Sequence, residues 1–71
     1  MSKNRVRHFR KNVLNKTQAE MGEYFDISQQ AYAQKENGAR DFKMNEMEKF
    51  KILVMREGVY VSIDEIFFTV D

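Results

Sequence analysis

Hydrophobic residues recur along this chain at helical intervals. Near its start Val6, Phe9 and Val13 fall three or four positions apart and share one face of a helix that we expect over residues 2–14. Ser2 is a suitable cap for this helix, and Asn15 is expected to end it. The apolar face predicts packing against other helices.

A longer amphipathic helix is predicted to run from about residue 44 to the Glu57-Gly58 pair, where a glycine favours a helix end. Its apolar face is expected to contain Met44, Met47, Phe50 or Lys51, and Val54, with Leu53 beside them.

Two shorter helices are predicted between these. Residues 17–20 form a capping box, TQAE, in which threonine and glutamate satisfy each other's backbone N–H groups, so a helix is expected over about residues 17–25. Residues 26–28 interrupt the pattern and end on a serine that caps a further helix over about residues 29–36. The Asn37-Gly38 pair is a left-handed stop for that helix.

The C-terminal stretch carries two competing patterns. Val59, Val61 and Ile63 alternate as in a strand, whereas residues 62–65 form a second capping box. We favour a short helix. Residues 66–70 are more apolar than a free chain end, so we expect them to be covered. Together the elements predict an all-α fold of four to five short helices in a single domain, residues 1–71.

Composition limits the chemistry that this domain can perform. Among its 71 residues there is no cysteine and one histidine, His8, so we expect no metal site, no cofactor and no enzyme activity. The longest apolar run, residues 52–55, is far shorter than a membrane span, and no apolar stretch follows the basic start as in a signal peptide. We therefore expect a cytoplasmic protein that does not enter membranes.

Charge is distributed unevenly. Residues 1–16 hold six basic and no acidic side chains, whereas residues 17–71 hold six basic and eleven acidic ones, which leaves a net charge of +1. A basic N-terminal part suggests a polyanion or an acidic partner surface nearby.

Residues 17–38, TQAEMGEYFDISQQAYAQKENG, resemble the helix-turn-helix of lambda-repressor-like proteins, the Cro and phage-repressor group. The resemblance extends to Val6, Phe9 and Arg10 in that family's first helix and to residues 61–67 in its final capped helix. It implies a lambda-repressor-like DNA-binding domain with its helix-turn-helix at about residues 17–36.

The resemblance also implies functional residues. A helix that enters the major groove presents hydrogen-bonding groups near its N-terminus, and glutamine can bind adenine through two hydrogen bonds. Gln18 is expected to contact a phosphate. Arg10 and Glu36 resemble a pair that joins the first helix to the recognition helix. The expected base-reading residues are Ser28, Gln29, Gln30 and Gln34, and the further phosphate contacts are Lys11, Lys16, Arg40 and Lys43.

The chain departs from the family pattern in four ways. Asp26 stands where the turn usually has glycine, and Tyr32 replaces a β-branched core residue. Lys35 occupies an apolar position, so either its stem snorkels over the core or the helix is rotated or loosely held. One extra residue lies between Arg10 and Thr17.

The first functional hypothesis is a sequence-specific DNA-binding transcriptional regulator that acts as a homodimer on a palindromic operator in double-stranded DNA. The second is an antirepressor or modulator that uses its helix-turn-helix face to bind a second repressor protein, and the third is an antitoxin-type regulator. The expected pairing surface lies in the tail, residues 59–71, and contains Val59, Tyr60, Phe67, Phe68 and Val70.

Overall fold

The computed structural model describes residues 4–68, and over this range it is an all-α globule without strands. The helical interpretation of the C-terminal part is therefore confirmed, and the strand alternative is wrong. None of the helices in this range is long and apolar enough to span a membrane. The elements are α1 (Val6–Phe9), a π-helical turn (Arg10–Leu14), α2 (Gln18–Phe25), α3 (Gln29–Glu36), α4 (Met44–Arg56) and α5 (Ile63–Phe67).

The first helix differs from its prediction. It begins at Val6, whose N–H donates to Asn4 Oδ1 at 3.1 Å, and the expected cap Ser2 lies outside the described residues. After Phe9 the chain continues as the π-helical turn and stops where Asn15 adopts a left-handed conformation at φ 54°. A π turn contains about one residue more than an α turn, so the segment between Arg10 and Thr17 holds one residue more than a regular α-helix would.

Both predicted capping boxes are confirmed. Thr17 Oγ1 accepts from the Glu20 N–H at 3.1 Å, and the Thr17 N–H donates to Glu20 Oε1 at 2.9 Å. The Ser62 and Glu65 pair repeats this geometry at 3.1 and 3.0 Å. Ser28 Oγ accepts from the Ala31 N–H at 3.0 Å, so α3 also begins as predicted.

The turn between α2 and α3 is tight. Asp26 takes the left-handed conformation at φ 59°, and the Ile27 N–H donates to Gly22 O at 2.9 Å. A Cβ atom on Gly22 would lie only 3.0 Å from Ile27 O and 3.2 Å from Ser28 O, both backbone atoms. The absence of a side chain at position 22 therefore allows α3 to start directly against α2.

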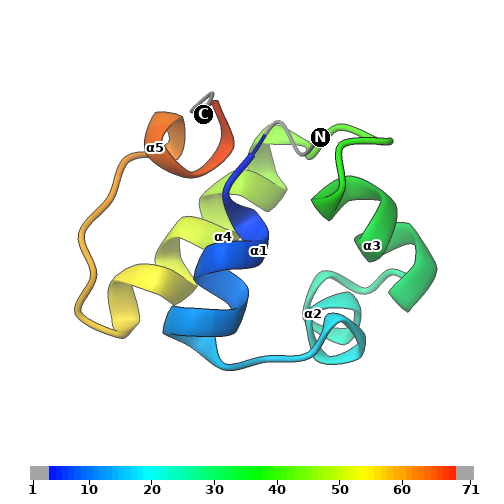
Figure 1. Ribbon diagram of the computed structural model, residues 1–71, viewed down its shortest axis with the longest axis horizontal. Coiled ribbons are helices and arrows are strands. Elements are labelled where there is room, and N and C mark those ends of the chain that lie inside the picture. Colours follow the sequence, from blue (N-terminus) through cyan, green and yellow to red (C-terminus); the bar gives the residue numbers. More distant parts are fainter. Residues whose placement is uncertain (1–3, 69–71) are drawn as a thin grey trace.

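The core lies between α1 and α4, with α5 at one end and α2 and α3 at the other (Figure 1). It is rich in aromatic rings, and Phe42 contacts Phe67 at a centroid distance of 5.1 Å. The α4 prediction is correct for Phe50 rather than Lys51, but wrong for Met44, which is 59% exposed. The buried apolar side chains are Val6, Phe9, Met21, Phe25, Tyr32, Phe42, Phe50, Val54, Ile66 and Phe67.

Candidate nucleic-acid interface

The N-terminal turn of α3 is the most open part of that helix. Ser28, Gln29 and Gln30 are exposed, and Gln34, one turn further on, is half-buried. The C-terminal turn of α3 is enclosed by the rest of the molecule. The expected base-reading residues therefore lie on one helix and are accessible from solvent.

One shallow hollow lies between α3 and the start of α2. Gln29 borders it from α3, Gln18 borders it from α2, and Lys11 and Lys16 supply two positive charges. Both lysines are exposed. The hollow is completed by Arg10, Asn15 and Thr17.

A second hollow lies on the other side of α3. Gln30 and Gln34 border it together with Ser28 and Ala31, and Arg40 closes it from the loop that follows α3. The Arg40 N–H donates to Gln34 O at 3.1 Å, which fixes the loop against the helix. Lys43, at the start of α4, is exposed but does not border this hollow. The glutamines of α3 thus have lysines on one side and an arginine on the other.

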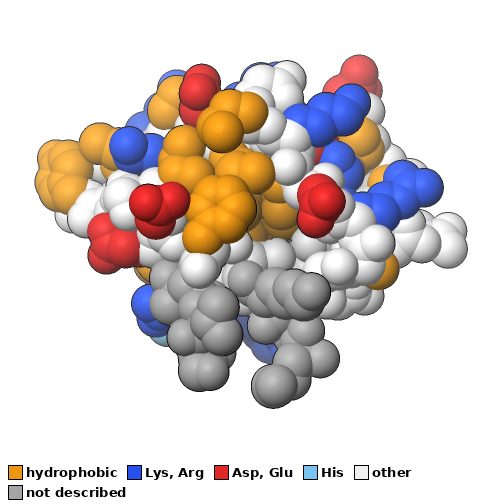
Figure 2. Space-filling model, turned by 90° about the horizontal axis from the view of Figure 1, so that it is seen from above, with side chains coloured by type: hydrophobic (Ala, Val, Ile, Leu, Met, Phe, Trp, Pro, Cys, Tyr) orange, Lys and Arg blue, Asp and Glu red, His pale blue; other side chains and the backbone are white. Residues whose placement is uncertain are grey.

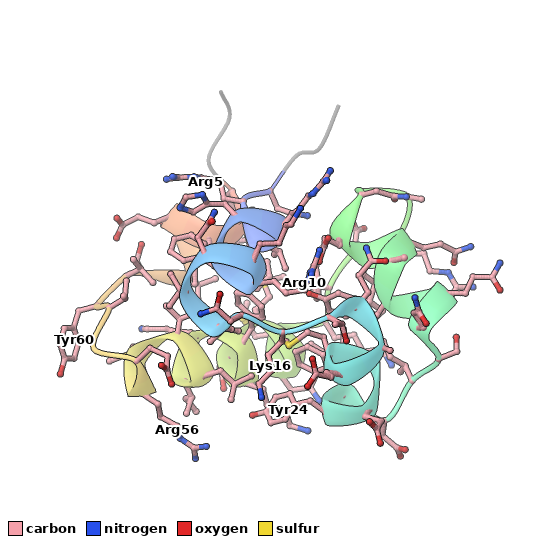
Figure 3. All side chains as sticks on the ribbon, turned by 60° about the horizontal axis from the view of Figure 1, so that its bottom comes forward. Arg5, Arg10, Lys16, Tyr24, Arg56 and Tyr60 are labelled. Carbon is pink, nitrogen blue, oxygen red and sulfur yellow. The ribbon has the colours of Figure 1, made fainter. Side chains whose placement is uncertain are left out.

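The predicted pair of Arg10 and Glu36 is present and buried. Arg10 Nε lies 2.7 Å from Glu36 Oε2, and Arg10 Nη2 donates to Glu36 Oε1 at 3.1 Å. Arg10 Nη1 also donates to Lys16 O at 2.8 Å, so one guanidinium joins the π turn, the segment before α2 and the end of α3 (Figure 3). Burial raises the pKa of Glu36, but the hydrogen bonds and charge of Arg10, together with the side chains of Tyr32 and Gln18, outweigh burial and lower the pKa overall.

Gln18 takes part in the same network. Its Nε2 donates to Glu36 Oε1 at 3.3 Å, and its side chain is half-buried. The expected phosphate contact therefore has one amide hydrogen bond inside the protein, while its helix end still borders the first hollow. Tyr32 is fully buried beside this network, and burial first, then the charge of Glu36, raises the pKa of its phenol.

Lys35 behaves differently from either sequence expectation. It does not snorkel to solvent, nor is α3 left loose, because Lys35 Nζ lies 2.6 Å from Glu46 Oε1 of α4 and both side chains are buried. Glu46 also accepts from the Lys43 N–H at 2.8 Å and so caps α4. Burial raises the pKa of Glu46, but its bonds to Lys35 and Lys43 produce a net lowering. Glu46 was missed from the sequence because only the fold brings it to α3.

The expected pairing surface in the tail is only partly exposed. Tyr60 is 79% and Phe68 56% exposed, and Tyr60 projects from the end of the molecule opposite α3 (Figure 3). Val59 is half-buried against the core. Phe67 is 6% exposed, so its assignment to a pairing surface is wrong: its ring packs on Phe42 and Phe50. Val70 lies outside the described residues.

Hydrophobic side chains come to the surface near the two chain ends (Figure 2). Phe68 borders a hollow there whose other walls are Asn4, Gly38, Arg40, Asp41, Phe42, Met47 and Phe67. A further cleft, between α2 and the end of α4, has Lys16, Tyr24 and Arg56 at its edge (Figure 3). Over residues 4–68 no group of histidine, aspartate and glutamate side chains is arranged to hold a metal ion.

We find no protein-family model, no curated protein and no solved structure that matches this chain. A functional proposal therefore depends on the residues and the geometry described above.

Proposed function

We propose that this protein is a small sequence-specific DNA-binding transcriptional regulator of the Cro and phage-repressor type, in which α2 and α3 act as a lambda-repressor-like helix-turn-helix. One observation carries the proposal. The exposed N-terminal turn of α3 presents Gln29 and Gln30 between two lysines, Lys11 and Lys16, and the arginine of the opposite hollow, Arg40.

This arrangement suits a DNA groove. The major groove has base edges at its floor and a phosphate strand on each side, so a reading helix needs amide or hydroxyl groups at its centre and cations on both flanks. Each two-bond contact between a glutamine and an adenine contributes about 1–3 kcal/mol of discrimination. The flanking lysines and arginine add affinity that is independent of sequence and falls with salt.

One recognition helix reads too few base pairs for useful specificity. We therefore propose that two copies bind one palindromic operator, with the half-sites about 34 Å apart, one turn of the double helix.

The test is selection of bound duplexes from a random pool at low salt, followed by a gel shift of the enriched sequence. We expect a palindrome to be enriched and to bind at least about 1,000-fold more tightly than random duplex at physiological salt. Absence of enrichment, with no shift of any duplex at micromolar protein, contradicts the proposal.

The second candidate is an antirepressor or modulator that engages another repressor protein through the same α2–α3 face. It is favoured by the net charge of −5 over residues 17–71, which disfavours a polyanion. This candidate predicts no binding to duplex DNA and release of the target repressor from its operator. An antitoxin-type regulator shares the DNA-binding step and gives the same gel shift as the first candidate.

A further inference from the structure

α4 has apolar side chains on its solvent-facing side as well as on its core side. Phe50 and Val54 are fully buried, whereas Ile52, which lies almost opposite Phe50 around the helix, is 49% exposed. Met44 is 59% exposed, and Met55, three residues after Ile52, is half-buried. Ile52 is thus an apolar side chain on the solvent-facing side of a helix whose other side packs in the core.

The charges beside Ile52 follow a simple order. Glu48 precedes Ile52 by four residues and Arg56 follows it by four, so the three side chains form one stripe along the exposed side of α4. Glu48 and Arg56 are exposed, and within residues 4–68 neither forms an ion pair. They lie on the same helix about 12 Å apart, too far to pair with each other.

We propose that this stripe, Glu48, Ile52 and Arg56, pairs with the same stripe of a second copy. When two such helices lie antiparallel with their isoleucines in contact, Glu48 meets the partner's Arg56 and Arg56 meets the partner's Glu48. A two-fold interface of this kind must be self-complementary, because each contact occurs twice. The order of acid, isoleucine and base is self-complementary only in the antiparallel arrangement.

A second copy of this chain is the binding partner whose charges complement the stripe. Its two charges cancel, so it offers no net attraction to a polyanion or to a uniformly charged partner. None of its three residues borders the hollows beside α3, so pairing leaves the glutamines accessible. The inference extends the proposed function, which needs two copies on one operator, but pairing itself occurs without DNA. Three side chains cover less surface than the roughly 800 Å² that each partner buries in a stable dimer, so the pair is weak in isolation.

The test is sedimentation equilibrium of the purified full chain without DNA, up to about 1 mM. We expect reversible dimerisation, and we expect Ile52→Ser to weaken it at least 10-fold. Tyr60→Ser separates this stripe from the tail surface expected from the sequence, since Tyr60 belongs to that surface, lies outside the stripe and is the most exposed large apolar side chain of residues 4–68. It should leave the dimer unchanged; a weaker dimer with Tyr60→Ser and not with Ile52→Ser would place the pairing in the tail and overturn the inference. Circular dichroism checks that each variant is folded.

Charge exchange gives the sharper result. Glu48→Arg alone and Arg56→Glu alone should each abolish self-association, because each creates two like-charge contacts in its dimer. An equimolar mixture of the two variants should associate, because both contacts are then between opposite charges. A wild-type chain that stays monomeric, single variants that dimerise normally, or a mixture that does not associate would overturn the inference. If the wild-type chain and the charge variants associate as expected but the wild-type chain binds no duplex DNA, the inference stands and the proposed function is contradicted.

Discussion

Lys35 and Glu36 are neighbours in the last turn of α3, and they form buried ion pairs with two different elements. Lys35 Nζ lies 2.6 Å from Glu46 Oε1 of α4, and Glu36 Oε2 lies 2.7 Å from Arg10 Nε in the π turn. The C-terminal end of α3 is therefore held from two sides, while the turn that carries Gln29 projects to solvent. Fixing one end of a short helix fixes the direction of the other, which is what a reading helix requires.

Replacing Arg10 by methionine should destabilise the protein by about 3–5 kcal/mol, because the carboxylate of Glu36 stays buried without its charged partner. Urea unfolding followed by circular dichroism measures the change. Arg7→Met is the matched control: Arg7 is exposed, so the expected change is below about 0.5 kcal/mol. Equal stability of the two variants would contradict a structural role for the Arg10 pair.

The pair of Lys35 and Glu46 is best tested by a double-mutant cycle. Lys35→Met alone should cost about 3 kcal/mol, since it leaves a buried carboxylate that only the Lys43 N–H still satisfies. The double variant Lys35→Met/Glu46→Gln should lose less than the sum of the two single losses, with a coupling energy above about 1 kcal/mol. Additive losses would show that the two side chains do not interact in solution.

Local signals were sufficient for most of the fold. The two capping boxes, Ser28 and the glycines at positions 38 and 58 set helix boundaries that the structure confirms, because each acts within four residues of itself. The π turn could not be predicted from the helical spacing of the apolar residues, because a single wider turn does not produce a repeating pattern in the sequence. The partner of Lys35 could not be predicted either, because Glu46 approaches it only after α4 has packed.

The assignment of Phe67 to the pairing surface is wrong for a related reason. Apolar residues near a chain end predict burial against something, but not against what: Phe67 turned out to complete the core of its own chain. Met44 is the opposite case, since helical spacing placed it on the core face although it lies at the first position of α4 and is exposed.

Stability should fall on acidification. The pKa values of Glu36 and Glu46 are lowered in the folded state, so at acidic pH the unfolded chain binds more protons than the folded chain. The stabilisation that these two carboxylates contribute is therefore complete only above the ordinary glutamate pKa of about 4.3. The urea midpoint should decrease as the pH falls below about 4.5 through the folded values. Glu36→Gln should be less stable at pH 7 but lose less between pH 5 and pH 3. If Glu36→Gln loses as much stability between pH 5 and pH 3 as the wild-type protein does, the lowered pKa of Glu36 is not a cause of the acid sensitivity.

Gly22→Ala should disturb the junction of α2 and α3. The added Cβ meets the backbone oxygens of Ile27 and Ser28, which cannot rotate away, so we expect a loss of about 1–3 kcal/mol and weaker DNA binding. Gly58→Ala is the control for replacing a glycine. The added Cβ meets no atom within 4 Å, but the backbone at position 58 has a φ of 85°, which strains any residue other than glycine. It should reduce stability while the DNA affinity of the folded protein stays the same. Unaltered DNA affinity in folded Gly22→Ala would contradict a close α2–α3 junction.

The most direct test of the central claim, that α3 reads base edges while its flanks bind phosphates, compares two variants on two duplexes. Gln29→Ala should weaken binding to the selected palindrome by about 1–3 kcal/mol and leave random duplex unaffected. Lys11→Ala should weaken both equally and reduce the slope of log affinity against log salt by about one. If Gln29→Ala reduces affinity for the palindrome and for random duplex by the same factor, α3 does not read sequence and the claim is contradicted.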